Sequence, residues 1–173
     1  LFDEAGIVGD KCTLSAEYCV RVGEAIANVV KKGETNKVGV ICSSIDNCRM
    51  VKQAILCGLY AGGAHGIDFG EGFESMAAYA ASHFRLELLL CIRNNDDDTL
   101  HVTMYDANGL YPDRTFERAL VGALSKPDAD INCDIKLTAT EKFSSLKFMY
   151  YSSLVHSIEH HLDGLKVSLN YTE

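Results

Sequence analysis

One stretch of sequence, LELLLCIRNNDDDTLHVTMYDANG at residues 86–109, decides the fold of this chain. Its short apolar run at residues 88–92 is bounded by polar residues, which is typical of a buried strand. A polar loop follows, and then residues 100–105 alternate in character as a second strand does. Asn108 and Gly109 tolerate positive φ and should end that strand in a turn. The connection between the two strands is too short for a crossover, so we expect them to run antiparallel.

Apolar spacing along the rest of the chain alternates between the helical and the strand period. Thr13 is placed to cap one helix and Asn47 to cap the next. Gly23 lies in the apolar face of the first helix and indicates close packing against the sheet. We expect helices over residues 13–32, 48–61, 76–84, from Pro112 onward, and 140–162, with further strands over residues 37–42, 65–70, 131–137 and 165–170. This order predicts an α/β fold with a mixed, mostly parallel sheet between helices.

The composition narrows the class of protein. The 173 residues are 47% hydrophobic and 23% charged, which fits one globular domain with a sizeable core. A net charge of −8 argues against nucleic acid and anionic membranes as partners on electrostatic grounds. The apolar runs are shorter than a membrane span, and the N-terminus does not read as a signal peptide, so we expect a cytoplasmic protein. Seven cysteines without paired spacing predict reduced, mostly buried thiols.

Tyr-Asp-Ala-Asn-Gly at residues 105–109, with the strand, loop and strand before it, resembles the catalytic segment of the phosphohexomutase superfamily, which includes phosphoglucomutases and phosphomannomutases. In that family the loop between the strands reads Thr-Ala-Ser-His-Asn-Pro. Counting back from Tyr105, this loop falls on residues 91–96. Arg93 then stands where the family has its phosphate-carrying serine, and Asn94 stands where it has histidine. Within this loop Asn95 alone matches.

Two other loops resemble the family without its arginines. Residues 5–9 resemble the family's Ser-Gly-Ile-Arg-Gly, with Val8 in place of the arginine. Residues 43–46 read Ser-Ser-Ile-Asp where the family has Arg-Asp-Thr-Arg. Near the other end, residues 164–170 resemble the strand that opens the family's second domain. The resemblance therefore implies a three-layer α/β/α sandwich, the family's first domain, over residues 1–164, with residues 165–173 beginning a second domain or forming a C-terminal strand.

The same resemblance implies a role in carbohydrate metabolism. Family members are isomerases, intramolecular phosphotransferases that interconvert hexose 1- and 6-phosphates through a phosphoserine and magnesium. Because Arg93 replaces that serine, we expect this chain to be catalytically inactive and to hold no cofactor itself, although an intact family member would need magnesium. The alternative is a non-catalytic phosphosugar-binding, regulatory or protein-interaction module on the same scaffold. The expected partners are further domains of the same protein or a family-type partner domain, and a phosphosugar.

Three groups of polar residues are candidate sites. The Arg93 guanidinium could bind a phosphate through its planar donors, or it could be a solvated loop residue paired with Asp96 to Asp98. Those three aspartates could attract a hard cation, but a solvated charge run is the stronger interpretation. His156 and His160 have the i, i+4 spacing of zinc ligands, but the motif has no third ligand, which favours exposed histidines.

Overall fold

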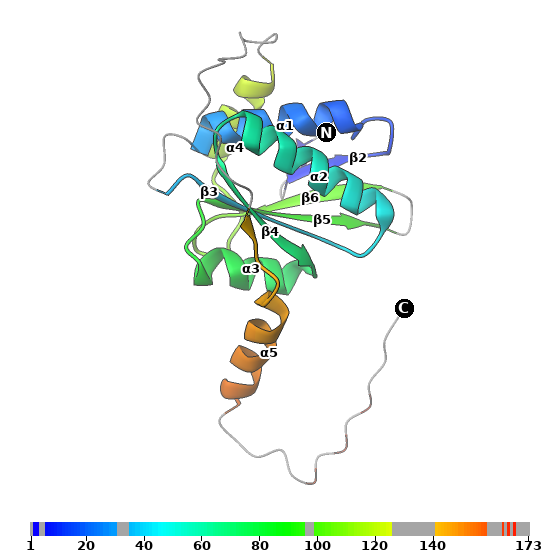
Figure 1. The fold of residues 1–173 in the computed structure, drawn as a ribbon. Helices are drawn as coiled ribbons and strands as arrows, with labels where there is room; N and C mark the ends of the chain where they lie inside the picture. Colours follow the sequence, from blue (N-terminus) through cyan, green and yellow to red (C-terminus); the bar gives the residue numbers. More distant parts are fainter. Residues whose placement is uncertain are drawn as a thin grey trace.

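The computed structural model describes residues 2–3, 6–30, 35–95, 99–125 and 141–158, together with residues 164, 166 and 168. In this part of the chain, a seven-stranded mixed sheet carries helices on both faces (Figure 1). The strands, in their spatial order, are β1 (Phe2–Asp3), β2 (Gly6–Gly9), β6 (Leu100–Tyr105), β5 (Leu88–Asn94), β3 (Lys37–Cys42), β4 (His65–Glu71) and β7 (Glu141–Lys142). The predicted three-layer α/β/α class is confirmed.

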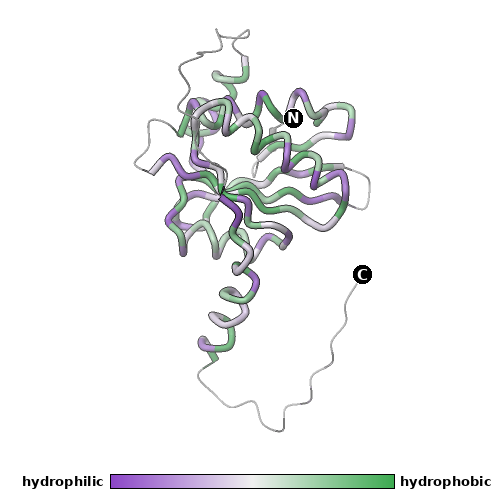
Figure 2. Tube along the Cα trace, in the orientation of Figure 1, coloured by the Kyte–Doolittle hydropathy of each residue, from purple (hydrophilic) through white to green (hydrophobic). Residues whose placement is uncertain are grey.

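The stretch at residues 86–109 forms the centre of this sheet. β5 and β6 pair antiparallel, with Ile92 opposite Val102, as the short connection predicted. On its other side β5 pairs parallel with β3, and β3 pairs parallel with β4. The half of the sheet formed by β5, β3, β4 and β7 is therefore parallel, and the half formed by β1, β2, β6 and β5 is antiparallel. Figure 2 shows the mainly apolar character of β5 and β6.

The turn after β6 has the predicted chemistry. Gly109 has φ +74°, a left-handed conformation that favours glycine. The Asp106 Oδ1 atom accepts hydrogen bonds from the backbone N–H groups of Asn108, at 2.9 Å, and Leu110, at 3.0 Å. A Cβ at Gly109 would lie 2.6 Å from the Ala78 carbonyl oxygen, so the turn also packs closely against a helix.

Three helices cover one face of the sheet: α1 (Ala16–Val30), α2 (Asp46–Ala61) and α4 (Arg114–Leu124). The glycine in α1 has a different partner from the one expected. A Cβ at Gly23 would lie 2.3 Å from the Ile55 carbonyl oxygen of α2, and one at Gly58 would lie 2.0 Å from the Val20 carbonyl oxygen of α1. Gly23 thus brings α1 against α2 and not against the sheet, because the two glycines face each other across the helix pair.

The other face carries α3 (Glu74–His83), whose alanines and Met76 pack on β5 and β6. α5 (Leu146–His156) begins against α3 and then extends away from the sheet (Figure 1). The helix expected from residue 140 starts later than predicted. Glu141 and Lys142 instead pair parallel with Ile67 and Asp68 as strand β7. The expected strand at residues 131–137 lies outside the described residues, as do most of residues 165–170 and the proposed domain boundary around them.

Two predicted helix caps are wrong. Thr13 lies in the turn before α1, where its backbone N–H and its hydroxyl both donate to Asp10 Oδ1, at 2.7 and 2.6 Å. Ser15 Oγ instead accepts from the Tyr18 N–H at 3.3 Å, at the start of α1. Asn47 lies inside the first turn of α2, which begins at Asp46 without a side-chain cap. Asp113 does cap α4, accepting from the Phe116 N–H at 2.8 Å.

Candidate functional site at the carboxyl ends of β3, β4 and β5

The carboxyl ends of the parallel strands β3, β4 and β5 meet at one edge of the sheet, which is where α/β domains commonly bind ligands. Ser43 follows β3, the segment from Gly72 to Ser75 follows β4, and Arg93 lies near the end of β5. Together they line an open pocket of about 350 Å³. The lining residues are Ser43, Gly72, Phe73, Glu74, Ser75, Cys91 and Arg93.

Arg93 lies in this pocket as one half of an ion pair. Its Nε atom is 3.0 Å from Oε1 of Glu74, the first residue of α3, and the two side chains are 43% and 40% exposed. The same Oε1 atom is 3.4 Å from the donating hydroxyl of Thr103. Arg93 belongs to strand β5, opposite His101, and not to the loop in which it was expected. Asp96 to Asp98 lie outside the described residues, so the carboxylate seen beside Arg93 is Glu74.

The two asparagines after Arg93 bond within the β5–β6 hairpin. Asn94 Nδ2 donates to the Asn95 carbonyl oxygen at 3.1 Å. The Asn95 amide nitrogen Nδ2 is 3.0 Å from His101 Nε2, and the Asn95 backbone N–H donates to the Thr99 carbonyl oxygen at 2.9 Å. These contacts close the hairpin, so Asn95, the one loop residue that matches the family, has a structural role here.

Two further titratable groups interact with Glu74: the Cys91 thiol, which lines the pocket, and the Tyr105 hydroxyl, which is not among the lining residues. Burial, with a further contribution from the Glu74 carboxylate, raises the pKa of the Cys91 thiol to about 12. Since the thiolate is the reactive form, Cys91 is a poor nucleophile at neutral pH. Burial, and then Glu74, also raises the pKa of Tyr105 above its ordinary value. Across the described residues, no histidine ring is recorded within hydrogen-bond distance of a serine hydroxyl or cysteine thiol at this pocket.

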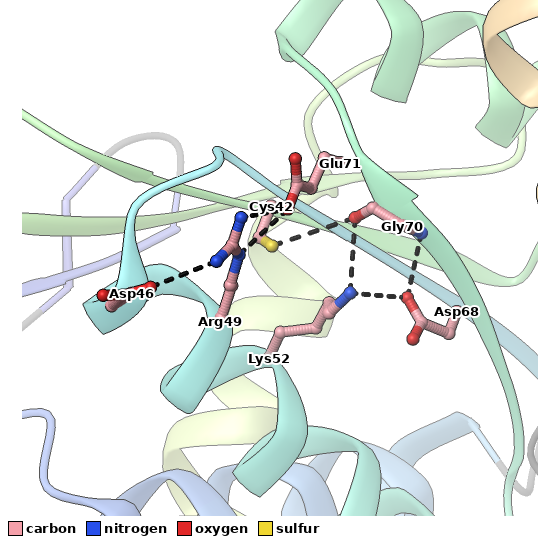
Figure 3. A network of polar contacts seen from close by, with 7 residues as sticks. All are labelled: Cys42, Asp46, Arg49, Lys52, Asp68, Gly70 and Glu71. Carbon is pink, nitrogen blue, oxygen red and sulfur yellow. Dashed lines mark hydrogen bonds and ion pairs between the residues drawn. The ribbon is translucent and has the colours of Figure 1, made fainter.

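A buried ion pair next to this edge was missed by the sequence reasoning. Lys52 of α2 and Asp68 of β4 lie 2.8 Å apart, Nζ to Oδ1, with each side chain 8% exposed (Figure 3). Lys52 Nζ is also 3.4 Å from the Gly70 carbonyl oxygen. The available signal was an aspartate in the middle of an otherwise apolar strand, because such a carboxylate needs a cation or several donors when it is buried.

The same ion pair holds an irregularity in β4. The strand register moves from Val40 opposite Asp68 to Cys42 opposite Glu71, which adds one residue to β4. Gly70 takes φ +76° there, and its N–H donates to Asp68 Oδ1 at 2.9 Å. Such a bulge re-aims the side chains that follow it.

Glu71, directly after the bulge, meets a cation of α2. The Arg49 guanidinium lies 2.7 Å from Glu71 Oε1 and 3.1 Å from Asp46 Oδ1 (Figure 3). In this second network Arg49 and Glu71 are about half exposed and Asp46 is almost fully exposed, unlike the buried Lys52–Asp68 pair. Both networks join α2 to the strands at the edge of the sheet where the pocket lies.

Nowhere among the described residues do three histidine, cysteine, aspartate or glutamate side chains come together as candidate metal ligands. His156 Nδ1 lies 2.7 Å from the Ser152 carbonyl oxygen, while His160 lies outside the described residues. As for membrane insertion, none of the described helices is long and apolar enough to span a bilayer.

The chain is thus a three-layer α/β domain with an open pocket at the carboxyl ends of its parallel strands. Two solved structures share the fold. One is a protein from Thermus thermophilus described as a phosphomannomutase, with TM-score 0.74 and 17% identity over 90% of this chain. The other is a phosphoglucomutase/phosphomannomutase family protein from Burkholderia thailandensis, with TM-score 0.67 and 18% identity over 88% of this chain.

These similarities establish the fold of the chain. The chain spans about a third of the length of the two proteins, 36% and 34%. It therefore resembles one domain of phosphohexomutase-type proteins. No protein-family model and no curated protein sequence matches the chain.

Proposed function

We propose that this chain is a phosphohexomutase-like domain that does not carry a phosphoryl group, and that it acts as a non-catalytic part of a larger assembly of domains. The observation that carries this proposal is the ion pair between Arg93 and Glu74 at the end of β5. By the family resemblance, this is the position of the phosphate-carrying serine. A guanidinium remains protonated at neutral pH and is not a nucleophile.

The neighbouring groups support the same conclusion. The Cys91 thiol has a pKa of about 12, so it is protonated at neutral pH. Ser43 and Ser75 line the pocket, but a serine needs a general base beside it to attack a phosphorus centre. Glu74 is the carboxylate among the lining residues and is already committed to Arg93 and Thr103. In the described part of the chain, the pocket thus lacks the paired nucleophile and base that phosphoryl transfer requires.

The test is a coupled phosphomutase assay on the longest product of the reading frame that encodes this chain. Glucose 1-phosphate and mannose 1-phosphate are supplied in turn, with magnesium and a bisphosphate activator. A known phosphoglucomutase under the same conditions is the positive control, and circular dichroism confirms that the product is folded. We expect no turnover above background. Turnover at either substrate would overturn the proposal.

A second candidate function is binding of a phosphosugar without catalysis. The pocket of about 350 Å³ is large enough for a small ligand, and Arg93 offers donors for a phosphate. Glu74 opposes this role because it neutralises the guanidinium. This second candidate function therefore predicts weak phosphosugar binding, which the loss of the Glu74 carboxylate strengthens and the loss of the Arg93 guanidinium weakens.

Isothermal titration with glucose 1-phosphate separates the two candidates. In Glu74→Gln, the guanidinium loses its carboxylate, and we expect affinity to rise about tenfold, the value of one charge-assisted hydrogen bond of ~1.5 kcal/mol. Arg93→Gln should abolish any binding, and Glu71→Gln, outside the pocket lining, is the matched control. Equal affinities in the wild type, Glu74→Gln and Arg93→Gln would exclude a phosphosugar site at Arg93.

A further inference from the structure

The two opposite sides of the apolar helix α5 have different surroundings. One side packs on the domain: Leu146 is buried, and the Tyr150 ring lies 5.5 Å from Tyr79 and 5.7 Å from Phe73, measured between ring centroids. These contacts fix the first turns of α5 against α3. The helix then continues beyond the sheet, where Figure 1 shows it projecting from the body of the domain.

The opposite side of α5 is apolar and exposed. Phe148 is 76% exposed and Val155 is 67% exposed, which is unusual for large apolar side chains. Other exposed apolar residues accompany them along the helix and just beyond it, and Figure 2 shows apolar stretches in this segment. We name this set the α5 seam; its members are Phe148, Tyr151, Leu154, Val155 and Ile158.

The spacing of the α5 seam favours another helix as its partner. Phe148, Tyr151, Val155 and Ile158 follow one another at three, four and three residues, which is the a/d spacing of paired helices. Phe148, Tyr151 and Val155 lie within α5, where at 3.6 residues per turn they form one stripe, and Ile158 follows just beyond the end of the helix at His156. A stripe of this kind is buried when knobs of one helix enter holes of another.

We propose that the α5 seam binds the α5 seam of a second copy of this chain, in a two-fold dimer. Two identical apolar stripes are complementary to each other, as a contact around a two-fold axis requires. The exposed parts of the five side chains amount to roughly 500 Å² per protomer, or about 1,000 Å² in the dimer, the lower bound for a specific interface.

Charge supports a second copy as the occupant. The whole chain carries a net charge of −8, so most surfaces of two copies repel each other. Residues 146–158 contain no aspartate or glutamate, and their basic residues are Lys147 and His156. The α5 seam is therefore a surface on which two copies can meet without bringing carboxylates together.

Sedimentation velocity of the 173-residue chain, from low micromolar concentration upward, tests the proposal. We expect a concentration-dependent dimer. Phe148→Glu and Val155→Glu should each weaken it by at least about a hundredfold, because the contact is lost twice in a two-fold dimer. Val121→Glu is the matched control: Val121 is an exposed apolar residue of α4, 42% exposed, and its substitution should leave the dimer intact.

Both variants replace exposed side chains, so the domain should stay folded, which far-UV circular dichroism checks. A wild-type chain that remains monomeric at every concentration would overturn the proposal and leave the α5 seam to a different domain. A dimer that withstands both seam substitutions would overturn it too. Association into an open series of larger species would also refute it, because a two-fold contact closes at the dimer.

Discussion

Replacing Lys52 by methionine should destabilise the domain far more than removing any surface ion pair. Lys52 Nζ and Asp68 Oδ1 are 2.8 Å apart, and each side chain is 8% exposed, so both charges are withdrawn from water. Lys52→Met keeps the volume of the side chain and leaves the Asp68 carboxylate buried without its cation. Such a change typically costs ~3–5 kcal/mol. We expect about 3 kcal/mol, the lower end of that range, because the Gly70 N–H still donates to Asp68.

Urea unfolding followed by circular dichroism measures this loss, provided that the denaturant slope is unchanged. Arg49→Met is the matched control on the same helix, since its partner Glu71 is 48% exposed and such pairs contribute at most ~1 kcal/mol. A double-mutant cycle with Asp68→Asn isolates the interaction between Lys52 and Asp68. The reasoning fails if Lys52→Met costs no more than Arg49→Met.

Further predictions concern a helix contact and the thiols. Gly58→Ala should destabilise the domain by at least ~2 kcal/mol, because the new Cβ would lie 2.0 Å from a carbonyl oxygen of α1 and force α1 and α2 apart. Gly122→Ala, with open space around it, should instead stabilise the domain by ~0.5–1 kcal/mol. Thermal unfolding of both variants measures the difference. The free energy of unfolding should fall as the pH rises from 9, the ordinary pKa of a thiol, to about 12, the raised pKa of Cys91 in the folded chain. In this range the Cys91 thiol loses its proton in the unfolded chain but keeps it in the folded chain, which favours unfolding. Cys91→Ala should flatten this decline in unfolding curves recorded against pH. Iodoacetamide should modify exposed Cys57 in the native chain well before Cys91, as peptide mass spectrometry can follow.

The sequence predicted those parts of the fold that local patterns determine. The β5–β6 hairpin was predictable because its connection is short and its turn residues are Asn108 and Gly109. The α1 cap was predicted at the wrong residue because Asp10 binds Thr13 and moves the start of the helix. Strand β7 was missed because two residues joined to the sheet through their backbone leave no side-chain pattern.

The candidate site was less predictable because its contacts join distant residues. Arg93 was predicted as a site residue from the family resemblance of the sequence, but its partner Glu74 belongs to the start of helix α3. Lys52 and Asp68 likewise come from α2 and β4. Arg93, Glu74 and Lys52 each resemble a solvated charge in the sequence, and Asp68 alone carries a signal of burial, from the apolar strand around it. Their pairing follows from the parallel order of β3, β4 and β5, which brings these segments to one edge.

The pairing of charges at this edge bears on the proposed function as a whole. Three basic side chains gather there in the described part of the chain, and each lies within ion-pair distance of a carboxylate; the pairs are Arg49 with Asp46 and Glu71, Lys52 with Asp68, and Arg93 with Glu74. A site that holds a phosphoryl group needs an excess of cations or hydrogen-bond donors over carboxylates. Of these charged residues, Arg93 and Glu74 are the two that line the pocket, so a phosphate that binds Arg93 there would displace its ion pair with Glu74. The domain thus shares its fold with one domain of phosphohexomutase-type structures, while Glu74 occupies the cation among its pocket residues that a phosphate would need.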